Sequence, residues 1–309
     1  MRRQLFVPNE ENPKKVEVTP FVLDLFQEID YHGLMRTYHI FETFPTQNKT
    51  NLYVKLGRLF DHKYLGRENA FDYRKHRKRG SLPLFYWLRP KAKYELAKAN
   101  RPYTGKMDYD PPPPALQNLE HDLAVTTFMV KVKMYCLRHS LRFISHYEIL
   151  ENAPPETQAK IGKKDDSPFK FVVKAEYNGK VYEKITATPD KVFGIERQDM
   201  RRGYFFPELC MGLGQPHSRP TPSASSVRKK HVVYDAVFDH GLHRKQLNIP
   251  NFRVPFITTK GIDHAKNIIQ ETRINEGKNI FYSGVLKDIE DPFTYLWETR
   301  TGEMKTLLQ

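Results

Sequence analysis

Two acidic residues at predicted strand positions have the chemistry to bind a divalent cation. Asp190 directly follows Pro189, and Glu208 lies in the next predicted strand, YFFPELC. Carboxylates on neighbouring strands of one sheet can converge on such a cation, which prefers hard oxygen ligands. Because alternate residues of a strand share a face, a third ligand is expected two residues after Glu208. That position holds Cys210, so the sequence predicts a metal site with one ligand missing.

The segments that must position these carboxylates predict a mixed α/β domain. A long amphipathic helix is expected first, then a group of strands, and then helices and strands in alternation. Asn178-Gly179 favours a tight type I′ hairpin turn, and Ser225 or Ser226 can cap a following helix. The expected helices are residues 116–139, 225–240 and 261–275, and the expected strands are 143–150, 169–177, 180–188, 191–196, 204–210, 252–259, 279–284 and 293–298.

The composition favours a nucleic-acid partner. The 309 residues contain 50 Lys and Arg against 36 Asp and Glu, which gives a net charge of +14. Such an excess attracts polyanions, nucleic acid first. Residues 1–110 carry +8 of this charge in about a third of the chain. Two cysteines give no disulfide framework, and no apolar run is long enough for a membrane span, so a cytoplasmic protein is expected.

The first hundred residues predict three helices separated by short turns. Thr19-Pro20 is typical of a helix start, and Gly33 ends that helix. A second helix is expected from Thr37 to Pro45 and a third over residues 46–62. In the third, leucines recur at four and three residues, and the polar residues on the other side are candidates for DNA contact: Asn48, Lys49, Asn51, Lys55 and Arg58. A third helix in such an arrangement can enter the major groove.

A strongly basic segment connects the two strands expected after these helices. KYLGRE and LPLFYWL predict the strands, and the link FDYRKHRKRGS carries five positive charges at Arg74, Lys75, Arg77, Lys78 and Arg79. A hairpin with a basic tip grips phosphates, and each contact adds salt-dependent affinity without reading sequence. Together with the three helices, this pattern predicts a winged helix-turn-helix domain.

The chain therefore predicts an α+β and α/β protein in four parts. Residues 1–18 form an arm, 19–100 the winged-helix domain, 101–115 a proline-rich linker, and 116–309 the α/β domain. The linker contains RPYTGKMDYDPPPP, whose prolines favour a stiff, extended spacer.

The order of elements in the second domain resembles the restriction-endonuclease-like core, the PD-(D/E)XK group. Pro189-Asp190 matches PD, and Glu208-Leu209-Cys210 matches E-x-K except that the lysine is absent. The resemblance implies that Asp190 and Glu208 bind a metal. In some members of the group a lysine from the following helix takes over, and Lys229 and Lys230 are the candidates here.

A wider resemblance covers nearly the whole chain. RLFDHKYLGR, LEHDLAV, TPD, FFPELCMGLGQP and SSVRKKHVVYDAVFDHGLH are similar to the replication-relaxation family of plasmids, integrated elements and phages. The family's central strand usually carries a second acid where this chain has Cys210. The resemblance implies a part in DNA replication or relaxation.

Three hypotheses follow. The first is a DNA-binding protein of a mobile element, acting in its replication, relaxation or maintenance, with an inactive nuclease-like domain and no cofactor needed for DNA binding. The second is a Mg²⁺-dependent DNA endonuclease or nickase that uses Asp190, Glu208 and Lys229 or Lys230. The third is a transcriptional regulator. The expected partners are double-stranded DNA and proteins of a replication or mobilisation complex. The third hypothesis also predicts a symmetric homodimer, and no membrane is expected.

Overall fold

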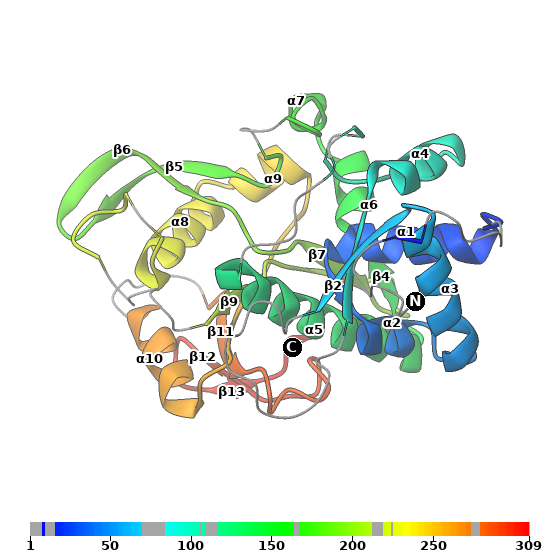
Figure 1. Ribbon diagram of the computed structural model, residues 1–309. Helices are drawn as coiled ribbons and strands as arrows, with labels where there is room; N and C mark the ends of the chain where they lie inside the picture. The colour runs from blue at the N-terminus through cyan, green and yellow to red at the C-terminus, as the bar shows by residue number, and fades with distance from the viewer. Residues whose placement is uncertain are drawn as a thin grey trace. The chain divides into compact units, whose positions relative to one another are not determined.

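The computed structural model describes residues 8–9, 16–69, 84–105, 107–108, 110, 116–163, 167–211, 219–223, 225–272 and 279–308. Internal contacts divide the chain into two units, Met1–Val130 and Lys131–Gln309. Figure 1 shows the elements of each. Both combine helices with small sheets, which confirms the predicted mixture of α and β structure.

Unit 1 begins with the three predicted helices. They are α1 (Pro20–His32), α2 (Thr37–Thr43) and α3 (Lys49–Asp61). The hydroxyl of Thr19 accepts a hydrogen bond from the Val22 N–H and caps α1, while Gly33, with φ of 79°, ends it. These are the start and stop that Thr19-Pro20 and Gly33 predicted, because Pro fits the first turn and Gly tolerates a positive φ.

A small antiparallel sheet completes the helices of unit 1. Its strands are β1 (Met35–Arg36), β2 (Leu65–Asn69) and β3 (Leu84–Leu88), and β3 lies between the other two. Helix α4 (Pro90–Lys98) follows. The chain therefore runs helix, strand, helix, helix, strand, strand, and β2 and β3 are the two predicted strands.

The long helix α5 (Leu116–Arg138) contributes to both units. Its residues Leu119 and Leu123 are buried with Leu34, Phe85 and Trp87 in the core of unit 1. The first part of this helix, which was expected to open the C-terminal domain, thus completes the N-terminal core. The start of the proline-rich segment also belongs to unit 1, where the Thr104 N–H donates to Asp30 at 2.6 Å.

In unit 2, a predicted strand is replaced largely by a helix. Residues 143–150 were expected to form a strand, but β4 covers only Arg142–Ile144 and α6 covers His146–Glu151. Ser145 and Glu148 form a capping box at the start of α6, in which each side chain accepts from the other's backbone N–H. This local pairing stabilises a helix start and overrides the apolar run. The short α7 (Pro155–Gln158) follows.

Two antiparallel sheets of unit 2 are formed by the strands that flank Asp190 in the sequence and precede Glu208. Strands β5 (Phe171–Tyr177) and β6 (Lys180–Ala187) form a hairpin, with Asn178 at φ 51° and Gly179 at φ 76° as the type I′ turn requires. Strand β7 (Phe193–Glu196) pairs with both β4 and β8 (Arg202–Phe205).

The largest sheet of unit 2 has the order β13-β12-β11-β10-β9. Strands β9 (Glu208–Cys210), β10 (Val254–Thr258) and β11 (Phe281–Val285) are parallel, and β12 (Trp297–Thr299) and β13 (Met304–Lys305) are antiparallel to their neighbours. Helices α8 (Val227–Asp239) and α9 (Leu242–Leu247) lie between β9 and β10 in the sequence, and α10 (Ile262–Thr272) between β10 and β11. The inner side of α8 shares a core with β5 and β10, including Phe171, Val233 and Phe256.

Candidate functional site

The structure brings Asp190, Glu208 and Lys230 together. Asp190 lies between β6 and β7, Glu208 begins β9, and Lys230 lies in the first turns of α8. The Lys230 Nζ contacts Oε2 of Glu208 directly and lies 3.8 Å from Oδ1 of Asp190. Lys229, the other candidate, is half-buried, and no described contact joins it to either carboxylate. Of the two candidate lysines, Lys230 is therefore the one that the structure places beside the carboxylates.

Local structure holds each member of this cluster in place. Ser226 caps α8 by accepting from the Lys229 N–H at 3.2 Å. Tyr234 lies one helical turn after Lys230, on the same face, and its hydroxyl donates to Oε1 of Glu208. Asp190 accepts from the backbone N–H of Leu209 at 2.7 Å, which ties it to β9. Sequence reasoning missed Tyr234, although its i,i+4 spacing from Lys230 was a usable signal.

Burial and the charges of neighbouring groups both shift the pKa values of the cluster. The Glu208 side chain is 0% exposed, and its burial raises the pKa to about 8, against the opposing effect of the Lys230 charge. Burial alone would lower the pKa of Lys230, but the charges of Asp190 and Glu208 outweigh it and raise that pKa. Burial and the neighbouring Glu208 also raise the pKa of Tyr234 well above its usual value. The lysine therefore stays charged and serves as the cation of the site.

These donors do not fit a bound Mg²⁺. Both oxygens of Glu208 already accept from Lys230 and Tyr234, and one oxygen of Asp190 accepts from Leu209. Burial raises the pKa of the Cys210 thiol to about 12, so it stays protonated beside them. In the described part of the chain, no group of three or more His, Cys, Asp or Glu residues could hold a metal ion.

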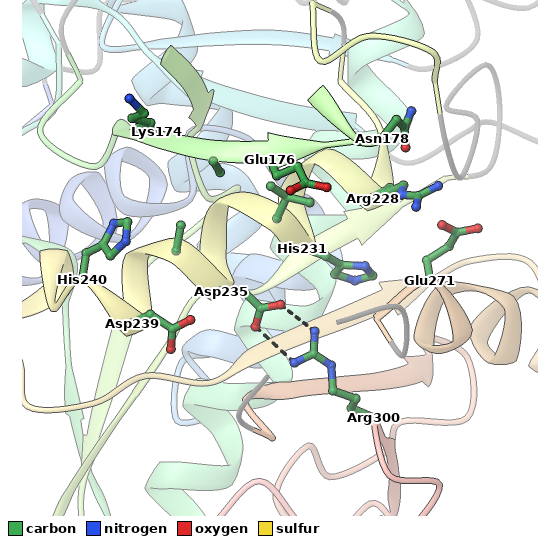
Figure 2. Close-up of a pocket in the computed structure, with 14 residues that line it drawn as sticks. Lys174, Glu176, Asn178, Arg228, His231, Asp235, Asp239, His240, Glu271 and Arg300 are labelled. Carbon is green, nitrogen blue, oxygen red and sulfur yellow. Dashed lines mark hydrogen bonds and ion pairs between the residues drawn. The ribbon is translucent and has the colours of Figure 1, made fainter. Parts of the chain in front are cut away.

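A pocket of about 400 Å³ lies beside α8 but does not include the cluster. Its lining comes from the β5–β6 hairpin, α8, α10 and Arg300, as Figure 2 shows. Asp235 and Arg300 form a buried ion pair there, with nitrogen to oxygen distances of 3.2 and 2.6 Å. Lys174, Arg228 and Arg300 are mixed with Glu176, Asp235, Asp239 and Glu271, so the lining has no dominant charge. The cluster and the pocket use different faces of α8.

The structure gives the DNA-contact candidates on α3 different surroundings. The Asn48 side chain caps the helix by accepting from the Asn51 N–H at 3.0 Å. Lys49 and Asn51 are exposed, and Arg58 is partly exposed. The ammonium of Lys55 lies 4.8 Å from the centre of the Phe21 ring. Asn48 thus has a structural role in starting α3, whereas the side chains of Lys49 and Asn51 face solvent.

The five basic residues of the expected wing, Arg74, Lys75, Arg77, Lys78 and Arg79, lie outside the described residues. Their flanking strands are described: β2 and β3 pair over five residues, from Leu65 opposite Leu88 to Asn69 opposite Leu84. The sequence between these strands is the basic segment.

Two apolar side chains on α3 were not singled out in the sequence. Tyr53 is 49% exposed and Val54 is 46% exposed. Because helix α3 buries Leu52, Leu56 and Leu59, helical geometry could have placed Val54 on the opposite side.

Comparison with known proteins adds no assignment. In the described residues, no helix is long and apolar enough to cross a membrane. No protein-family model, no curated protein and no solved structure matches this chain. The similarity to the replication-relaxation family therefore stays a prediction based on the order of the sequence motifs.

Proposed function

We propose that this chain binds duplex DNA through unit 1 as a winged-helix protein, with unit 2 acting as a nuclease-like scaffold without metal chemistry. The motif order similar to the replication-relaxation family supports a role in replicating, relaxing or maintaining a plasmid, phage or integrated element. On this proposal the partners are double-stranded DNA and proteins of the element's replication complex.

The observation that carries the proposal is the topology of unit 1. The order α1, β1, α2, α3, β2, β3, with β3 between β1 and β2, is the order that a winged helix uses. In such a domain the third helix enters the major groove and the β2–β3 connection contacts the backbone. Here that connection contains FDYRKHRKRGS. A positive segment placed there supports phosphate binding, since each neutralised phosphate releases counterions.

The charge distribution on α3 supports the same partner. Its exposed or partly exposed charged residues, Lys49, Lys55 and Arg58, are all basic. Its acidic residue, Asp61, is buried and accepts from the Asn9 N–H at 3.2 Å. A helix that shows only positive charge to solvent is suited to lie between two phosphate backbones.

The test is DNA affinity of the full chain as a function of salt concentration. Fluorescence anisotropy with a labelled duplex should give a steep loss of affinity with salt, and Arg77→Ala with Lys78→Ala should reduce the slope of log K against log salt by about 2. Lys163→Ala with Lys184→Ala removes the same charge from exposed positions of unit 2 and serves as the control. An unchanged slope in the first variant, or equal loss in both, contradicts the wing assignment.

One observation favours a second candidate, a metal-dependent DNA endonuclease. Lys230 reaches Glu208 from the helix that follows β9, where the nuclease-like group can supply its lysine. The test uses supercoiled plasmid with Mg²⁺ or Mn²⁺, with and without chelator, beside Asp190→Ala with Glu208→Ala. Retarded but intact plasmid in every lane supports the scaffold role. Cutting that needs the metal and is lost in the variant supports the nuclease.

A further inference from the structure

Asn51, Val54 and Arg58 form one stripe on α3. They are three and four residues apart, so they follow one another along a single helix face. Leu52, Leu56 and Leu59 occupy the opposite face and are 3% exposed or less. The stripe is therefore the part of α3 that lies furthest from the core of unit 1. Its polar ends, Asn51 and Arg58, flank the apolar Val54.

Val54 is the unusual member of this stripe. It is 46% exposed although it is apolar, and apart from Tyr53 the other outward residues of α3 are polar or basic. A partner that covers it must accept a small apolar group in the middle of a positively charged surface. The major groove of DNA meets both conditions, because thymine carries a C5 methyl group between two anionic backbones.

We propose that Asn51 and Val54 read an A·T base pair, with Val54 against the thymine methyl group and the Asn51 amide on the adenine edge. The inference rests on the proposed DNA binding by unit 1. In the major groove, adenine offers the N7 acceptor and the N6 amino donor, which an asparagine side chain matches with two hydrogen bonds. The methyl group of the thymine paired with that adenine is then within reach of Val54, which lies one turn further along the helix.

The experiment begins with a selection from a randomised duplex pool by the full chain. Each thymine of the selected site is then replaced by deoxyuridine, which removes only the methyl group. For the wild-type chain, one such replacement should weaken binding about fourfold, the effect expected for one buried methyl-sized group. Val54→Ala should bind the thymine site more weakly and should lose the sensitivity to that replacement.

A matched change tests the polar half of the proposal. Replacing the paired adenine by 7-deazaadenine removes the N7 acceptor, which should weaken binding by the wild type and leave Asn51→Ala unaffected. Tyr53→Ala is the control for Val54, because Tyr53 is equally exposed but lies about 100° around the helix. It should keep full sensitivity to the thymine methyl. These positions are exposed, so the variants should fold normally.

The outcomes distinguish failure of the proposed base-pair readout from failure of DNA binding by unit 1. If the wild type binds a selected site but ignores every thymine to deoxyuridine change, or if Val54→Ala remains equally sensitive, the proposed readout is wrong while DNA binding stands. If the pool yields no bound duplex at any salt concentration, the DNA-binding proposal itself is wrong, and the inference fails with it.

Discussion

At the scale of single residues, Glu208 has the most demanding surroundings. Its carboxyl group is fully buried between Lys230 and Tyr234. Lys230→Met should remove the cation and lower the free energy of unfolding by about 3–5 kcal/mol, because a buried carboxylate is left without its opposite charge. Urea denaturation at pH 9, where the carboxyl group with its pKa of about 8 is ionised in the wild type, measures this loss. Adding Glu208→Gln to the same chain should recover part of it, since the amide carries no charge.

The neighbouring lysine provides the control for that prediction. Lys229→Met changes a half-buried side chain for which no contact with the carboxylates is described, and it should cost less than about 1 kcal/mol, as is usual for surface positions. Equal effects of the two substitutions would mean that Lys230 does not serve as the cation of the site.

Glu208 should also make stability depend on pH. Its pKa is raised by burial from 4.5 to about 8 in the folded chain, so between these values the folded state holds a proton that the unfolded state has released. Stability from this group should therefore fall as pH rises from about 4.5 to 8 and stay level above that range. Urea denaturation across pH should show a shallower decline for Glu208→Gln than for the wild type. Parallel curves would contradict the raised pKa.

At the scale of elements, the packing of the β2–β3 hairpin requires a glycine at position 66. A Cβ atom on Gly66 would lie 2.0 Å from the Trp87 ring, which packs across β2. Gly66→Ala should destabilise unit 1 by about 1–3 kcal/mol, because the buried ring must shift. The measurement is urea unfolding, together with DNA affinity, which should fall as the hairpin that carries the basic segment is disturbed.

A second glycine gives a control for Gly66. A Cβ atom on Gly261, just before α10, meets nothing within 4 Å, and its φ is not in the positive range. Gly261→Ala should leave both unfolding and DNA affinity near the wild-type values. If Gly66→Ala is equally harmless, the close packing of Trp87 over β2 does not limit the hairpin.

At the scale of the whole molecule, the hydrogen-bonded cluster around Glu208 predicts that divalent metal does not change the stability of the chain. A ligand at a hundred times its dissociation constant stabilises a protein by about 2.7 kcal/mol. Because the carboxylate oxygens already have partners, millimolar Mg²⁺ should leave the melting temperature of the full chain unchanged relative to chelator. A rise of several degrees that Asp190→Asn abolishes would show a metal site.

The net charge of +14 also acts at this scale. Because its density is highest in residues 1–110, long-range attraction to DNA should favour contact through unit 1 rather than unit 2. Salt at physiological concentration screens charges beyond about 8 Å, so this steering weakens as ionic strength rises. The DNA affinity of the intact chain is therefore expected to fall with salt. This long-range effect adds to the salt dependence of the contacts made by α3 and the wing residues.

The sequence alone determined the features that depend on neighbouring residues. Thr19-Pro20 and Gly33 set the limits of α1, Asn178-Gly179 set the hairpin turn, and leucine spacing set the buried face of α3. Caps, turns and periodicity act over a few residues, so they can be recognised in order along the chain. The capping box at Ser145 and Glu148 was equally local but was missed beside an apolar run.

Only the tertiary structure decided which side chains meet. The sequence offered Lys229 and Lys230 as equals, but adjacent residues on a helix point about 100° apart, and packing turns Lys230 toward Asp190 and Glu208. It likewise placed Tyr234 on the second oxygen of Glu208 and the first part of α5 in unit 1. These contacts join residues far apart in sequence, and their geometry depends on how complete elements pack. The sequence therefore identified the carboxylates, while the tertiary structure decided that Lys230 and the Tyr234 hydroxyl donate to Glu208.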